Sequence, residues 1–281
     1  MADRKIVHSL ISNGGGFIQL PPWAGGQEDG IWQNLGIPTI FEQDVVQKYP
    51  IGTRYVDGQS TYHYYYAAGA ITVALTGITS TKGMLNSAGY VYGAHAAGVI
   101  KVKIDGTSNG VPAENYYAGG QIVFFAANSV GRSQMRIVSS LAAEATTPYA
   151  VELTLEQPTY QALADNVSCE VMPNRYVSCE SSFQGQSGDG TSGTCPTLGI
   201  PCRNMTAARY GWAQTWGPCF VGRTSTEPGD NQRQVCFSTD GSIQPISERW
   251  GAATSLSMQM AGYSLSIKAA GTGWIYLMID P

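Results

Sequence analysis

The residue types that support nucleophilic or acid–base catalysis are few and scattered in this sequence. Histidine occurs three times, at His8, His63 and His95. His63 lies within a tyrosine-rich stretch, which favours a packed or hydrogen-bonded role over general-base catalysis. We therefore predict no catalytic residues, and a protein that is not an enzyme.

Carboxylates are more numerous, but turns explain many of them. The chain has 20 acidic residues, and five of these begin Asp-Gly pairs, which are typical of tight turns: Asp29, Asp57, Asp105, Asp189 and Asp240. Asp189 lacks the spacing of a calcium-binding loop. Glu152 and Glu156 share one face of an expected strand, so a glycosidase pair is an alternative that no other residue supports. We expect no metal site and no cofactor.

All six cysteines lie in the C-terminal part of the chain: Cys169, Cys179, Cys195, Cys202, Cys219 and Cys236. Their spacing contains no CxxC pair, which argues against zinc. Synthesis in a cytoplasm favours reduced, buried thiols that pack as small apolar groups. If the protein later leaves the cell, Cys195 and Cys202 are the best candidates for a disulfide.

An aromatic stretch from residue 208 to residue 219 dominates the second half of the chain. Read as a strand, it places Tyr210, Trp212 and Trp216 on one face, with small residues on the other. We expect Gly217-Pro218 to end this strand. Such a row of rings predicts a packing seam, because each ring can bury a large apolar area. The alternative is a carbohydrate-binding platform formed by exposed rings: Tyr62, Tyr64, Tyr66, Trp212 and Trp216.

Composition favours strands and turns over helices. Charged residues make up 13% of the chain, against about 25% in typical domains, and glycine occurs 34 times in 281 residues. So few charges predict a surface that is partly covered in an assembly. The net charge of −4 without a basic cluster argues against nucleic-acid binding. No apolar run is long enough to span a membrane, and no apolar segment of an export signal follows Met1.

The first 45 residues predict an extended N-terminal arm. Glycines at 14–16 and Pro21-Pro22 disfavour regular structure. The arm is nevertheless too apolar for a disordered tail, so it must lie on its own body or on a neighbouring subunit. The arm residues that we expect at an interface are apolar: Phe17, Ile18, Leu20, Trp23, Ile31, Trp32 and Phe41.

The remainder predicts an all-β fold with two sandwich-like or barrel-like domains. We place the first domain at 46–180, a Gly/Ser-rich, cysteine-bearing loop at 181–204, and a small barrel-like domain at 205–281. Asp57-Gly58 indicates a hairpin, and a final hairpin is expected to end in the run 274–279. Alternation predicts two strands with distinct faces: one places Val151, Leu153 and Leu155 inward, and the other places Tyr62, Tyr64 and Tyr66 opposite His63, Tyr65 and Ala67. Only 137–145 has helix-forming residues, enough for one or two turns.

In the order of its motifs, the chain resembles virion structural proteins of tailed bacteriophages, particularly head decoration proteins of marine and environmental phages. The resemblance covers roughly residues 48 to 281. It is carried by these segments: 48–54 (KYPIGTR), 132–138, 153–158 (LTLEQP), 173–176 (PNRY), 210–218 (YGWAQTWGP) and 239–241. The insert near residues 179–202 departs from the pattern.

This resemblance implies a non-enzymatic cement or accessory subunit that binds the major capsid protein. Such a protein would be made in the host cytoplasm and would sit on the exterior of the phage head. A homo-oligomer is expected, and capsid lattices suggest a trimer because they offer threefold positions. Two alternatives stay open: another virion part, such as a tail, baseplate or fibre component, and the carbohydrate-binding module.

Overall fold

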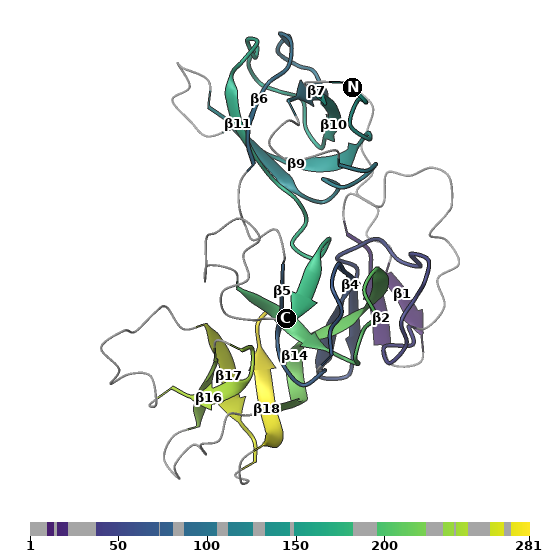
Figure 1. Cartoon of the computed structure of the whole chain (residues 1–281), viewed down its shortest axis with the longest axis vertical. Helices are drawn as coiled ribbons and strands as arrows, with labels where there is room; N and C mark the ends of the chain where they lie inside the picture. The colour runs from purple at the N-terminus through teal and green to yellow at the C-terminus, as the bar shows by residue number, and fades with distance from the viewer. Residues whose placement is uncertain are drawn as a thin grey trace. The chain divides into compact units, whose positions relative to one another are not determined.

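The computed structural model describes residues 10–13, 16–21, 38–72, 74–80, 87–105, 112–125, 133–146, 149–181, 196–222, 233–238, 240–246, 259–266 and 271–281. All helical or extended secondary structure in these ranges consists of β-strands, so the predicted all-β class is confirmed (Figure 1). No helix in the described ranges could cross a membrane. The chain forms two compact units, and the described residues of the first are Pro21 and those within Met84–Arg175.

The second unit is built from chain on both sides of the first. Its described residues fall within Ser9–Leu20, Asp29–Gly83 and Tyr176–Pro281. These boundaries differ from the predicted domains at 46–180 and 205–281. The reason is that strands preceding and following unit 1 hydrogen-bond within one sheet, and local sequence does not reveal such long-range pairing.

Unit 1 is a six-stranded sheet in the order β6-β11-β8-β9-β10-β7. Its strands are β6 (Ser87–Tyr90), β7 (Lys101–Ile104), β8 (Gln121–Phe124), β9 (Ser133–Ser140), β10 (Val151–Leu155) and β11 (Ser168–Met172). An antiparallel bridge between Val91 and Ile104 links the chain after β6 to β7, so the two edges of the sheet also meet. Closure of this kind leaves few unpaired edges.

The interior of unit 1 follows the predicted alternation. Val151, Leu153 and Leu155 are fully buried, while the residues between them are only partly buried. The helix expected at 137–145 is wrong. Ile137 lies within β9 and pairs with Leu155, because burial of its side chain in the sheet outweighs a weak local helix preference.

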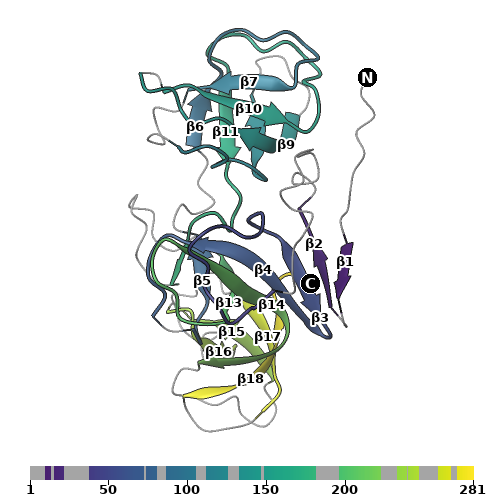
Figure 2. The same cartoon turned by 90° about the vertical axis from the view of Figure 1, so that its right-hand side faces the viewer.

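Unit 2 contains a closed ring of five strands. They are β4 (Ser60–Ala67), β12 (Cys179–Ser181), β5 (Ile78–Ser80), β13 (Thr197–Pro201) and β14 (Arg209–Gly222). Consecutive strands in this order pair, and β14 pairs back to β4. Figure 2 shows β4 and β14 side by side. Only the β4–β12 pair is parallel.

Buried apolar residues fill one side of this ring, among them Tyr65, Ala67, Ile78, Leu198 and Ala213. Along β4, Tyr65 and Ala67 are fully buried there, while Tyr64 packs with Tyr210 and Trp212 on the opposite face. The predicted alternation of β4 is therefore confirmed.

Two groups of strands extend the ring. Beyond β4 lie β3 (Arg54–Asp57), β2 (Gly16–Gln19) and β1 (Leu10–Asn13); beyond β14 lie β18 (Thr272–Met278), β17 (Met260–Ser264), β15 (Gln234–Phe237) and β16 (Ile243–Pro245). The expected hairpin at Asp57-Gly58 joins β3 to β4, and the expected C-terminal hairpin is formed by β17 and β18.

Part of the predicted extended arm is a hairpin. β1 and β2 pair antiparallel, and β2 pairs with β3, as Figure 2 shows at the edge of the sheet. Ile18 and Leu20 are 2% and 4% exposed. Backbone pairing of β2 with β3 thus outweighs the tendency of the glycines at 14–16 to disfavour regular structure. This part of the arm packs within unit 2.

The predicted end of the aromatic strand is also wrong, because β14 continues through Gly217-Pro218 to Gly222. Pairing with β4 stops at Trp216, so the missing N–H of Pro218 does not break a ladder on that edge. Gly217 has φ 93°, which favours glycine, and Pro218 still pairs with Tyr276 on β18.

Candidate functional site

A segment that precedes β3 exposes three apolar side chains to solvent. We call residues 38–48 the presenting segment. Phe41, Val45 and Val46 are 70%, 68% and 74% exposed, the three largest values for large apolar residues in the described part of the chain. Exposed apolar groups of this kind mark interaction sites when they are grouped and held in place.

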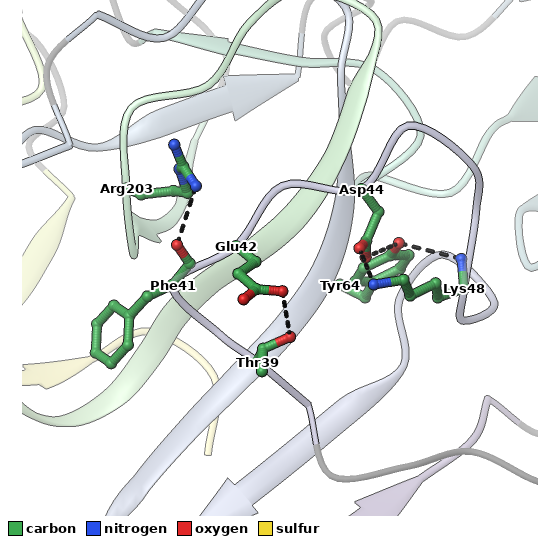
Figure 3. A network of polar contacts seen from close by, with 7 residues as sticks. All are labelled: Thr39, Phe41, Glu42, Asp44, Lys48, Tyr64 and Arg203. Carbon is green, nitrogen blue, oxygen red and sulfur yellow. Dashed lines mark hydrogen bonds and ion pairs between the residues drawn. The ribbon is translucent and has the colours of Figure 1, made fainter.

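The first half of the presenting segment is fixed by a turn and by a side chain from the loop after β13. Glu42 N donates to Thr39 O at 3.0 Å, and Thr39 Oγ1 donates to the Glu42 carboxylate at 3.0 Å. Arg203 Nη1 donates to Phe41 O at 3.1 Å (Figure 3). The backbone of Phe41 is therefore anchored, while its ring remains free of the core.

The middle of the segment is attached to the ring of unit 2. Asp44 and Tyr210 exchange two backbone hydrogen bonds, of 2.8 and 3.0 Å. Thr206 N donates to Gln43 Oε1 at 3.0 Å, and Gln43 Nε2 donates to Thr206 Oγ1 at 3.4 Å. These contacts pair the middle of the presenting segment with the start of β14.

A buried carboxylate fixes the second half. Tyr64 Oη donates to Asp44 Oδ2 at 2.8 Å, Lys48 Nζ lies 2.5 Å from Asp44 Oδ1, and Lys48 N donates to Tyr64 Oη at 3.2 Å (Figure 3). Asp44 is 7% exposed. Burial, together with the Asp44 carboxylate, raises the pKa of Tyr64 far above its usual value. Tyr64 therefore stays protonated and remains a donor.

This arrangement pre-organises a binding surface. The backbone that carries Phe41, Val45 and Val46 is already ordered, so a partner does not have to order it on binding. Each of the three side chains can gain about 1.5–3 kcal/mol when fully buried. The chemistry that the segment supports is apolar contact with another protein surface.

The role of Asp44 can be tested by truncation. We expect Asp44→Ala to lower the free energy of unfolding of unit 2 by about 1–3 kcal/mol, because the buried Tyr64 hydroxyl loses its acceptor. Urea unfolding measures the loss, and hydrogen exchange at the Tyr210 amide should quicken. Glu42→Ala is the matched control, since it removes an exposed hydrogen bond and should cost less than about 0.5 kcal/mol. Equal losses in both variants would contradict this role.

The predicted interface residues are not brought together. Phe41 is exposed, whereas Ile18 and Leu20 are buried within unit 2. Phe17 is half-buried, and the Arg54 guanidinium lies 5.9 Å from its ring centroid. The rest lie outside the described residues: Trp23, Ile31 and Trp32. Val45 and Val46 were not predicted as interface residues. The signal available in the sequence was an apolar pair between the polar residues Asp44 and Gln47-Lys48.

The aromatic seam is a packing element around Trp212. This side chain is 2% exposed, and its ring centroid lies 5.1 Å from Tyr49, 5.1 Å from Tyr64 and 6.0 Å from Tyr55. Tyr210 stacks on Tyr64 at 6.0 Å.

The carbohydrate platform predicted as an alternative needs exposed rings, and its members do not provide them. Tyr64 and Trp212 are buried, so neither can stack on a sugar. Tyr62, Tyr66 and Trp216 are half-buried.

Sequence reasoning did not anticipate a polar cluster around His63. Thr215 Oγ1 donates to Asp280 O at 2.6 Å, and His63 Nδ1 lies 3.1 Å from Thr215 Oγ1. His63 Nε2 lies 3.8 Å from Asp280 Oδ2, and the ring stacks on Tyr176. The residue types resemble a catalytic triad, but Thr215 is fully buried and its hydroxyl proton is given to a carbonyl. The cluster therefore ties the C-terminal residues to β4 and β14.

The described cysteines are Cys169, Cys179, Cys202, Cys219 and Cys236, and none of them is in a disulfide. All but Cys202 are buried, as predicted for thiols that pack as apolar groups. Burial raises the pKa of Cys169 and of Cys219 to about 12. The predicted disulfide between Cys195 and Cys202 stays a prediction, because Cys195 lies outside the described residues. Within the described ranges, no three His, Cys, Asp or Glu side chains gather to hold a metal.

Comparison of the chain with protein-family models, with curated proteins and with solved structures finds no match.

Proposed function

We propose that this chain is a non-enzymatic virion structural protein of a tailed bacteriophage, a head decoration subunit that binds the major capsid shell through the presenting segment. The observation that carries the proposal is the exposure of Phe41, Val45 and Val46 on a backbone fixed by Asp44 and Arg203. Three strongly exposed apolar side chains on an ordered backbone would suit the contact surface of an attachment subunit.

The small size of this apolar group suits a repeating target. Three side chains give only a modest contact, since stable interfaces bury about 800 Å² per partner. A homo-oligomer on a shell would multiply the contact, because linked copies bind with avidity beyond any single affinity. This favours an oligomeric accessory subunit on the exterior of the head.

The thiols fit synthesis in the reducing cytoplasm of the host. No disulfide joins the cysteines of the described ranges, four of these five cysteines are buried, and cytoplasmic proteins rarely rely on disulfides. Stability of the two units then comes from their closed sheets and apolar cores.

Co-sedimentation tests the proposal. The full chain is mixed with empty capsid shells from the same source, and bound protein is measured in the pellet. We expect the triple variant Phe41→Ser, Val45→Ser and Val46→Ser to bind at least about 10-fold more weakly, because the lost burial is worth several kcal/mol. The matched control replaces exposed apolar residues of unit 1, Tyr90, Leu141 and Tyr160, with serine.

Three outcomes separate the candidates. Binding that only the presenting-segment variant loses supports head decoration. Binding of the wild-type chain to purified tails and not to shells favours a tail, baseplate or fibre component. A wild-type chain that pellets with neither structure overturns the virion proposal.

A further inference from the structure

A second apolar surface lies on the strands that extend the ring beyond β14. One side of β14, β18 and β17 packs into a buried core that includes Val221, Ala261, Ile275 and Leu277. The other side is exposed, and we call it the aromatic face. Its exposed members lie between 39% and 48% exposed: Phe220, Met260, Tyr263, Leu265, Trp274 and Met278. The presenting segment contributes none of these residues.

The rings of the aromatic face brace one another across strands. Phe220 lies opposite Trp274, with ring centroids 5.5 Å apart, and Tyr263 lies opposite Tyr276, with stacked rings 5.2 Å apart. Trp216 meets Tyr276 edge-on at 6.0 Å. Side chains that are already held lose little conformational entropy when a partner covers them.

The aromatic face carries no charge on its described outward-facing side chains. Beyond the six exposed members, these are Trp216, Pro218, Thr272 and Tyr276. A contact between two identical faces around a twofold axis places each residue near its own copy or its neighbours, so like charges would repel there. A face without charge meets this condition, whereas an acidic or basic partner would find no complementary group.

The area is sufficient for such a contact. At roughly 200 Å² per large side chain, the six exposed members offer about 500 Å² per copy. Two copies would together bury about 1,000 Å², the lower bound for a specific interface. Sheets also pack face to face in a standard way, at a spacing of about 10 Å.

We propose that two copies of this chain associate through their aromatic faces, sheet against sheet, as a twofold dimer. The dimer goes beyond the proposed attachment to a capsid, and it holds for the isolated chain whether or not a shell is its target.

Sedimentation velocity of the full chain over a range of concentrations tests the dimer. For an interface of this size we expect a dissociation constant on the order of 1–100 μM. Trp274→Glu should raise it by at least about 100-fold, because it sets like charges against each other. Met278→Glu is a second variant on the same face. The matched control is Tyr160→Glu, on an exposed ring of unit 1.

Circular dichroism checks that each variant is folded. A dimer that both face variants disrupt and the control keeps supports the proposal. A wild-type chain that stays monomeric at about 1 mM overturns it, as does a dimer that Trp274→Glu and Met278→Glu leave intact, or a trimer. A monomer that binds polysaccharide, and loses that binding in Trp274→Glu, would assign the face to carbohydrate instead.

Discussion

Replacing Trp212 with alanine should lower the free energy of unfolding of unit 2 by about 3–5 kcal/mol, the usual cost of removing a large buried aromatic side chain. Trp212 is 2% exposed and contacts the rings of Tyr49, Tyr55 and Tyr64. The cavity would open between β14 and the chain that leads into β3, so these three rings would lose their shared packing partner.

Urea unfolding followed by tryptophan fluorescence measures this loss. Phe41→Ala is the control, since it truncates an aromatic residue of the same unit that is 70% exposed, and it should change stability by less than about 0.5 kcal/mol. If Trp212→Ala costs no more than Phe41→Ala, the packing role of the seam is wrong.

Unit 2 should unfold cooperatively as the pH rises from about 10 to 12. Burial raises the pKa of Tyr49 and of Tyr62 to about 12, and it raises the pKa values of Tyr64 and Tyr65 well above their usual value. A folded-state pKa above the unfolded value of 10.0 stabilises the fold fully below pH 10. That contribution is lost as the pH climbs toward the folded-state pKa, because only the unfolded chain releases the protons.

Tyrosinate absorbance and far-ultraviolet circular dichroism, recorded together against pH, test this expectation. The buried tyrosines should ionise only as the strand signal disappears. Tyr65→Phe should move the midpoint to higher pH, because it removes one buried ionisable group, while Tyr160→Phe, on an exposed ring, should not. Ionisation of all tyrosines near pH 10 in a protein that keeps its strand signal would contradict the burial.

Local patterns predicted the strands well where one face is buried. Val151, Leu153 and Leu155 show the expected period of two, and Asp57-Gly58 shows the expected hairpin. In both cases neighbouring residues determine the structure, since a pleated strand alternates its faces and a tight turn needs particular residues. The packing role of Trp212 follows from the same alternation.

Pairing between distant segments could not be predicted in this way. Cys179 of β12 pairs in parallel with Ala67 of β4, and the whole six-stranded sheet of unit 1 lies between them in the chain. Nothing local to either strand specifies that partner. Similarly, Pro218 is tolerated only because β4 leaves β14 at Trp216, which is a property of the assembled sheet.

The candidate site was only partly accessible from sequence. Phe41 was expected at an interface because it is apolar in a segment broken by glycine and proline. The placement of Val45 and Val46 depends on Asp44, whose carboxylate accepts a hydrogen bond from Tyr64 of β4. An aspartate in a loop is usually solvated, so its burial becomes evident only when the tyrosine is placed beside it.

The core of unit 1 lies in the chain between the two main segments of unit 2, and this order affects how the nascent chain can fold. The core of unit 1 comes from one continuous stretch, so it is complete once residue 175 has left the ribosome. The ring of unit 2 cannot close before β14 has been made, because β4 needs both β12 and β14 as partners. Until then the tyrosine-rich β4 lacks two of its partner strands, and during that interval translation speed and chaperones can influence the yield of native protein.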